Sequence, residues 1–157
     1  KDVLINWIII GDGREKSNVI EAIKKYDLQE HFHFLGSFQS SEMPYFFAFA
    51  DALLVSLKPS KIFSLTIPSK LQSYLACGKP IIGNLDGIAA SIILESNSGL
   101  CSPSGDEKNL AFNIEAMFNK NVKEREQLGL NGFNYYLENF ERNLVYNKLE
   151  KYLNSNV

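Results

Sequence analysis

Residues that hold metals or cross-link a fold are scarce in this sequence. Its 157 residues include two cysteines and two histidines. Cys77 and Cys101 lie in apolar surroundings without the spacing of metal ligands, which indicates reduced core thiols in a cytoplasmic protein. His31 and His33 alternate along an expected strand, but two imidazoles alone do not make a metal site. The sequence therefore predicts no bound metal.

Long apolar runs and an excess of positive charge are also missing. The longest apolar run lies within residues 3–10, which is far shorter than the roughly 20 residues that a membrane-spanning helix needs. The formal net charge is -2, so the chain has no general positive field of the kind that holds a nucleic-acid backbone. Membrane-spanning and nucleic-acid-binding proteins are the classes that these features exclude.

The composition is that of an ordinary soluble globular protein, with 45% hydrophobic and 22% charged residues. A chain of this length buries about 70% of its unfolded surface on folding and can form one complete core. We therefore expect residues 1–157 to form a single domain.

Apolar runs closed by glycine or polar residues alternate with segments of helical periodicity. The expected strands are residues 4–10, 31–35, 52–57, 79–84 and 99–101. The expected helices are residues 17–26, 42–50, 68–77, 88–96, 106–118, 123–137 and 141–153. This alternation predicts an α/β fold with a doubly wound, Rossmann-like parallel sheet, on whose flank the helical C-terminal tail packs. The near-continuous apolar run at residues 4–10 predicts a strand buried on both faces.

Parallel sheets of this type bind ligands beyond the carboxyl ends of their strands, so the turns at those ends are the candidate sites. Gly11 and Gly13 follow the first expected strand, where glycines let backbone amides approach a phosphate. An ordinary tight turn explains them equally well. The third glycine of the dinucleotide fingerprint is missing, which argues against a nicotinamide cofactor.

Gly36 closes the second expected strand, and Phe38 follows it. Phe38 can flank a planar base at the carboxyl edge of the sheet, although an aromatic residue at such a position is more often part of the core.

A further candidate is the segment that opens the fourth expected helix after a loop with two lysines. It consists of Thr66, Ile67, Pro68, Ser69 and Lys70. The free amides of the helix start, the Ser69 hydroxyl and the Lys70 ammonium can converge on a diphosphate. The alternative is a capped helix with a solvated lysine.

The order of these elements resembles the C-terminal domain of family-4 glycosyltransferases of the GT-B architecture. The segments that carry the resemblance are residues 8–13 (IIIGDG), 34–36 (FLG), 50–56 (ADALLVS) and 76–82 (ACGKPII). The turns at residues 86–87, 98–100 and 103–106 also fall where that family has turns. The resemblance covers nearly the whole chain.

The resemblance implies binding of a nucleoside diphosphate sugar, with a UDP-sugar as the expected donor. It places the base near residues 36–38 and the diphosphate near residues 66–70. Many members of the family carry two glutamates separated by seven residues, one near the donor sugar and one on the ribose. The matching positions hold Leu65 and Ser73. Ser73 can still bond to the ribose, and Lys70 is a candidate phosphate ligand that compensates for the missing carboxylates.

The resemblance also implies a role for the whole enzyme. That role is sugar transfer with retention at the anomeric carbon to a glycan or lipid-linked acceptor, in the branch that builds capsule and lipopolysaccharide. The enzyme would need no metal or other cofactor and would act in the cytoplasm or peripherally at the inner membrane. We expect the chain to lack the family's first strand and its acceptor-binding N-terminal domain, and so to be inactive alone. The alternatives are a non-catalytic nucleotide-binding module and a sugar-nucleotide epimerase of the same architecture.

Overall fold

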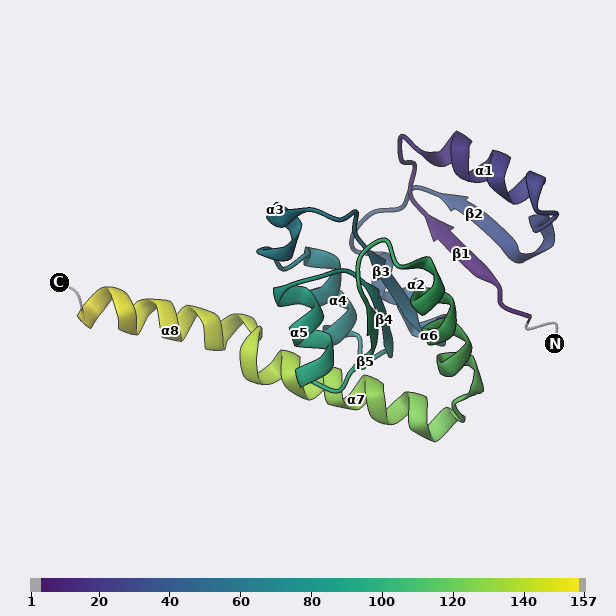
Figure 1. Cartoon of the computed structure of the whole chain (residues 1–157). Coiled ribbons are helices and arrows are strands. Elements are labelled where there is room, and N and C mark those ends of the chain that lie inside the picture. The colour runs from purple at the N-terminus through teal and green to yellow at the C-terminus, as the bar shows by residue number, and fades with distance from the viewer. Residues whose placement is uncertain (1–3, 156–157) are drawn as a thin grey trace. The chain divides into compact units, whose positions relative to one another are not determined.

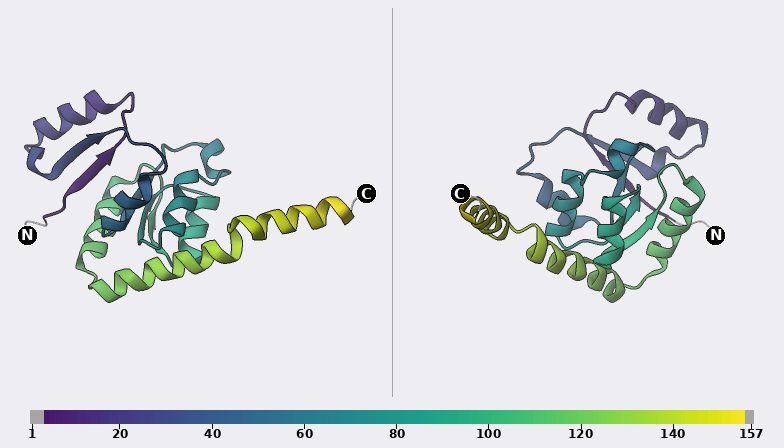
Figure 2. Two further views of the ribbon diagram at one scale, coloured as in Figure 1. Left: turned by 180° about the vertical axis from the view of Figure 1, so that it is seen from behind. Right: turned by 60° about the vertical axis from the view of Figure 1, so that its left-hand side comes forward.

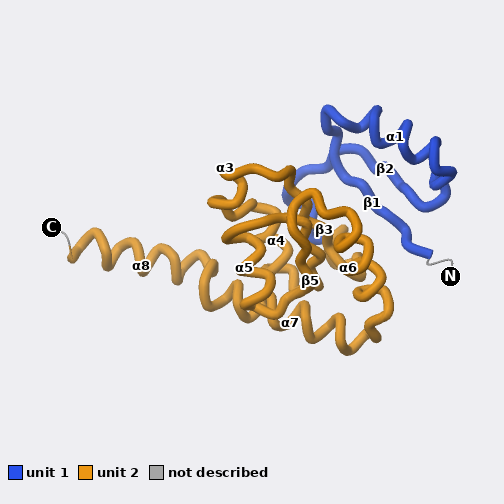
Figure 3. The backbone as a smooth tube through the Cα atoms, viewed as in Figure 1, with its two compact units in different colours: residues 1–45 blue, residues 46–157 orange. Residues whose placement is uncertain are grey.

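The computed structural model describes residues 4–155, which divide into two compact units (Figure 3). Unit 1 comprises residues 1–45 and unit 2 comprises residues 46–157. Helix α2 (Met43–Phe49) runs across the boundary. The α/β fold predicted from the sequence is confirmed, because all five strands pair in parallel and helices connect them (Figure 1).

Unit 1 is a parallel strand pair with one crossover helix. Strands β1 (Trp7–Ile10) and β2 (Phe32–Gly36) are joined through α1 (Lys16–Lys25) and a 3-10 turn, η1 (Gln29–His31). The expectation that β1 is buried on both faces is wrong, because Ile8 is 53% exposed. In a two-stranded sheet with a single crossover helix, the helix covers only one face and leaves the other face uncovered.

The histidine pair also differs from the expectation. His31 belongs to η1 and not to the strand, so the two imidazoles do not alternate along one strand. The Nε2 atom of His33 lies 3.3 Å from Oδ1 of Asn6.

Unit 2 contains a three-stranded parallel sheet in the order β3 (Leu53–Ser56), β4 (Ile81–Asn84) and β5 (Gly99–Ser102). Helices α4 (Ser69–Ala76) and α5 (Ile88–Glu95) lie on one side of the sheet, and α6 (Glu107–Asn119) lies on the other (Figures 1 and 2). Helices on both faces make this unit doubly wound. They also explain why every residue of β4 is buried.

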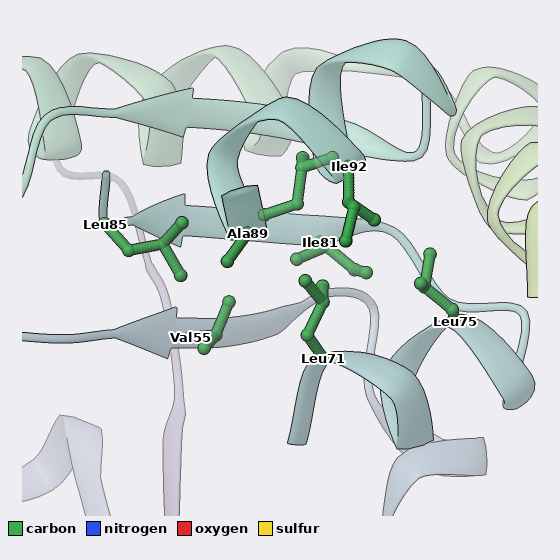
Figure 4. Packing of buried hydrophobic residues seen from close by; sticks show 8 residues of the cluster. Val55, Leu71, Leu75, Ile81, Leu85, Ala89 and Ile92 are labelled. Carbon is green, nitrogen blue, oxygen red and sulfur yellow. The ribbon is translucent and has the colours of Figure 1, made fainter. Parts of the chain in front are cut away.

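The core of unit 2 fills the space between the sheet and helices α4 and α5 (Figure 4). Its buried members are Val55, Leu71, Leu75, Ile81, Leu85, Ala89, Ile92 and Ile93. Leu71 and Leu75 are one helical turn apart, so α4 presents one apolar face to the core, while Ser69, Lys70 and Ser73 remain exposed. This packing fixes the position of α4 and, with it, the position of the helix start.

The C-terminal helices α7 (Val122–Asn139) and α8 (Arg142–Ser155) differ in their packing. Helix α7 lies against α4, with Gly129 so near Gly78 that a Cβ atom at Gly129 would be 2.1 Å from the Gly78 carbonyl oxygen. Helix α8 extends away from the end of α7 and buries none of its residues (Figure 1). The expectation that the whole helical tail packs on the sheet is therefore correct for α7 and wrong for α8. The Glu141 carboxylate accepts a hydrogen bond from the Leu144 amide, so α8 starts as a separate capped helix.

Candidate functional site

The carboxyl ends of β3, β4 and β5 lie at one edge of the unit 2 sheet, because the three strands are parallel and in register. Three connections leave this edge, namely residues 57–68, 85–87 and 103–106. The first of them includes a short helix, α3 (Lys61–Ser64), in a region that the sequence pattern predicts as a plain loop. The Ser60 side chain caps this helix by accepting a hydrogen bond from the Ile62 amide.

Helix α4 starts one residue later than its sequence predicts. Pro68 has an extended conformation (φ -64°, ψ 137°) and is the cap residue, so the helix begins at Ser69. No side chain caps the helix start. The first amides of a helix have no partner within the helix, so the amides of Ser69 and Lys70 can donate to an anion. The Leu71 amide instead donates to the Pro68 carbonyl at 2.9 Å.

Polar and basic side chains surround this helix start. Ser69, Lys70 and Ser73 are all exposed. The Thr66 hydroxyl donates to the carbonyl oxygen of Phe63, whereas Ile67 packs against the core. Five of the candidate residues thus lie in or just before the first turns of α4, namely Thr66, Pro68, Ser69, Lys70 and Ser73.

The charged side chains in the segment that contains this helix start are all positive. Residues 52–85 contain four lysines and no aspartate or glutamate. Lys58, Lys61 and Lys70 are all exposed, and two of them lie in or beside α3. These lysines, with the partial positive charge of the helix terminus, favour an anionic ligand at the start of α4, whereas Asp86 and Asp106 add negative charge at the same edge of the sheet.

Asn84, the last residue of β4, holds the carboxyl ends of the strands together. Its side chain is 5% exposed and donates to the Ser102 hydroxyl at 3.0 Å and to the Pro103 carbonyl at 2.7 Å. Its Oδ1 atom accepts from the Ser56 hydroxyl at 3.4 Å and from the Gly105 amide at 3.3 Å. The sequence pattern does not predict this role for Asn84. The available signal was a polar residue at the end of an otherwise apolar strand.

The predicted residues of unit 1 surround the ends of β1 and β2. The Gly11 amide donates to the Gly36 carbonyl at 2.7 Å, and both glycines have positive φ (122° and 81°), which other residues rarely adopt. Within unit 1, no atom lies within 4 Å of the position that a Cβ atom would occupy at Gly11, Gly13 or Gly36. Phe38 is 40% exposed. These residues form an open edge that a planar or flexible ligand can approach.

The turn after β1 carries negative as well as positive charge. The Asp12 carboxylate pairs with Lys16 at 3.1 Å, and Glu15 is the cap residue of α1. The glycines of this turn can still lie close to a ligand. The negative charges make the turn less suited to a phosphate than the start of α4.

Neither cysteine forms a disulfide, and burial raises the pKa of both the Cys77 and the Cys101 thiol. Within residues 4–155 there is no cluster of three or more histidine, cysteine or acidic residues that can hold a metal ion. None of the helices in this range is long and apolar enough to cross a membrane.

Comparison with known proteins identifies the family. Residues 2–135 match the family described as glycosyl transferases group 1. The chain belongs to this family. It is 26% identical over 132 residues to the uncharacterized glycosyltransferase MJ1178 from Methanocaldococcus jannaschii, a match that covers 84% of this chain and 36% of the relative.

Solved structures share the fold at low sequence identity. Alr3699/HepE from Anabaena, in complex with UDP, has a TM-score of 0.82 and 18% identity over 96% of this chain and 41% of its own. Sucrose-phosphate synthase from Thermosynechococcus elongatus has a TM-score of 0.73 and 18% identity, over 96% of this chain and 39% of its own. This chain therefore spans about two fifths of the length of the proteins that it matches.

Proposed function

We propose that this chain is the donor-binding half of a retaining glycosyltransferase. In this proposal the enzyme moves a sugar from a UDP-sugar to a glycan or lipid-linked acceptor during the synthesis of bacterial surface polysaccharide. The observation that carries the proposal is the start of α4, where exposed Ser69 and Lys70 follow an uncapped helix terminus in a segment without acidic residues. Membership of the group 1 family supports sugar transfer as the reaction.

The diphosphate of the donor would bind at this helix start. The free amides of α4 and the Ser69 hydroxyl donate hydrogen bonds to phosphate oxygens, and Lys70 supplies a full positive charge. A hydrogen bond to a charged group contributes about 1.5–3 kcal/mol. The helix terminus contributes a further ~0.3–1 kcal/mol at an exposed site.

The same groups would assist catalysis as the bond between the anomeric carbon of the donor sugar and the diphosphate oxygen breaks. Negative charge then develops on the departing diphosphate, and donors already in place stabilise that charge without reorganisation. The chain's own contribution to the reaction is therefore binding of the donor and stabilisation of its leaving group.

Two structural neighbours support uridine as the base. HepE was solved with UDP and with UDP-glucose, and the pneumococcal O-GlcNAc transferase GtfA with UDP and GlcNAc. We place the ribose near Ser73. Retention at the anomeric carbon and the acceptor rest on the resemblance to family-4 glycosyltransferases. The polysaccharide pathway rests on the resemblance of Pro68, Ser69 and Lys70 to the branch of that family that builds capsule and lipopolysaccharide.

The absence of carboxylates at Leu65 and Ser73 favours a second candidate, a nucleotide-binding module without transferase activity. Leu65 is 67% exposed, so an apolar side chain stands in solvent where many relatives carry a glutamate. This candidate shares the predicted binding site and differs in the predicted reaction.

Calorimetric titration of the chain with UDP, UDP-N-acetylglucosamine, GDP and NAD tests the donor-binding proposal. We expect saturable binding of the uridine compounds and weaker binding of GDP. Saturable binding of NAD without binding of any UDP compound would contradict it. Transfer assays on the full-length enzyme then separate the transferase from the binding module, and the anomeric configuration of the product, read by NMR, tests retention.

A further inference from the structure

The turn between β4 and α5 lies directly against the end of α3. Gly87, the residue before α5, has φ +70°, and a Cβ atom added to it would lie 1.9 Å from the carbonyl oxygen of Ser64. Atoms cannot approach so closely, so the two backbones are in contact only because residue 87 has no side chain. Ser64 is the last residue of α3 and lies shortly before the start of α4.

The neighbouring residue, Asp86, fixes a second turn. Its carboxylate accepts hydrogen bonds from the Ser104 amide at 3.1 Å and from the Ser104 hydroxyl. Gly105, the next residue of that turn, faces Pro59, since a Cβ atom at Gly105 would lie 3.2 Å from Cγ of Pro59. Residues 86 and 87 therefore lie close to the connection between β3 and α4 near both ends of α3. Gly87 contacts Ser64 directly, and Asp86 holds the turn in which Gly105 faces Pro59.

Hydrogen bonds also hold together the connection between β3 and α4. Ser60 caps the start of α3, and the Ser64 hydroxyl donates to the Lys61 carbonyl at 2.9 Å. At the other end, the Thr66 amide and hydroxyl both donate to the carbonyl of Phe63, at 3.2 and 3.0 Å. These hydrogen bonds join residues 60–66 into one compact turn that leads directly into the start of α4.

We propose that Asp86 and Gly87 are positioning residues for the donor site. They hold α3 and the start of α4 in the arrangement that receives the diphosphate. The inference rests on the proposed function of that helix start and adds a role for a turn to which no ligand contact is assigned. A site whose donors are already in place loses less conformational freedom on binding, so loosening this support should weaken donor binding.

Gly87→Ala is the most direct perturbation. The added methyl group must displace Ser64, so we expect faster hydrogen exchange at the amides of Ser64, Leu65 and Thr66 in the free protein. We also expect about tenfold weaker binding of UDP, as for a site that has lost one charge-assisted hydrogen bond. Met117→Ala is the control for lost stability, because Met117 is a buried core residue near the far end of α6. This variant should unfold more easily and bind UDP as the wild type does.

A series at Asp86 separates positioning from charge. Asp86→Ala removes both acceptors for Ser104. Asp86→Asn loses the charge but keeps one oxygen that can accept from the Ser104 amide, and its NH2 group can donate to the Ser104 hydroxyl. Positioning predicts weaker UDP binding for the alanine variant and largely restored binding for the asparagine variant. If Asp86 acted by repelling the diphosphate, both variants would bind UDP more tightly than the wild type.

The outcomes distinguish the two proposals. If the wild type fails to bind UDP, the proposed function is wrong. If hydrogen exchange at the amides of residues 64–66 also stays unchanged in Gly87→Ala, the proposal that Gly87 holds α3 in place is wrong as well. If the wild type binds UDP and Gly87→Ala binds it equally well, the donor site stands and the positioning role is overturned. Unchanged exchange at residues 64–66, or tighter binding by both Asp86 variants, also overturns it.

Discussion

The Ser73 hydroxyl donates a hydrogen bond of 3.1 Å to the backbone carbonyl of Ser69, four residues earlier on α4. This bond uses the only proton of the hydroxyl, so Ser73 can offer a ligand its lone pairs alone. The resemblance to family-4 glycosyltransferases implies a glutamate at this position, with two oxygens that can accept hydrogen bonds from ribose hydroxyls.

Ser73→Glu should therefore strengthen UDP binding. A carboxylate makes stronger hydrogen bonds than a hydroxyl, and we expect a gain of about 1–2 kcal/mol. Calorimetry with UDP and with 2′-deoxy-UDP measures the effect, because the gain should be smaller for the deoxy compound. An equal gain for both nucleotides would contradict a ribose contact at residue 73.

Lys70→Ala should weaken UDP binding by about 1.5–3 kcal/mol, which is the usual contribution of a hydrogen bond to a charged group. The effect should shrink as the salt concentration rises, since Lys70 is exposed. Lys123→Ala is the matched control, because Lys123 is an exposed lysine near the start of α7. Equal affinities for the wild type and Lys70→Ala would remove Lys70 from the site.

Much of the fold is readable from the sequence, because apolar runs that end at glycine or polar residues mark β1, β3, β4 and β5. Helix α3 is not readable in this way. Its four residues are too few to show a helical period, and Ile62 is 73% exposed. The helix exists because Ser60 caps it and Gly87 lies against its last residue. Such a contact between residues distant in the sequence leaves no local pattern.

The exposure of β1 and α8 shows the same limit. The apolar run of β1 predicts a buried strand, yet burial depends on how many strands and helices cover it. The amphipathic pattern of α8 likewise predicts packing but names no partner. For the candidate site, the sequence located the start of α4 from Pro68 to Lys70. It missed the Asn84 hydrogen bonds, which form only when the carboxyl ends of three strands meet.

Gly129→Ala should destabilise the protein by about 1–3 kcal/mol, as overpacking of a tight contact does. The new methyl group would lie 2.1 Å from the Gly78 carbonyl oxygen, so α7 would have to move away from the turn after α4. Urea unfolding monitored by circular dichroism measures the loss. Gly13→Ala is the matched control, since no atom lies within 4 Å of a Cβ atom at that position. Equal midpoints for the two variants would contradict close packing of α7.

Acid should destabilise the start of α6 through Asp106. Hydrogen bonds from the backbone and side chain of Asn109 hold the pKa of Asp106 below its usual value of 3.8. Because the pKa is lower in the folded state, this stabilisation is present above pH 3.8 and is lost as the pH falls through the native pKa. Asp106→Asn keeps a capping side chain without the charge. Its Tm should fall less steeply than that of the wild type between about pH 5 and pH 3. Parallel Tm curves would contradict this role.

The central claim is that the start of α4 binds the diphosphate of a nucleotide sugar. A titration of the ¹⁵N-labelled chain with UDP, followed by amide chemical shifts, tests it most directly. We predict the largest changes at Ser69, Lys70 and Leu71. Saturable UDP binding that leaves the amides of residues 66–73 unshifted would contradict the account.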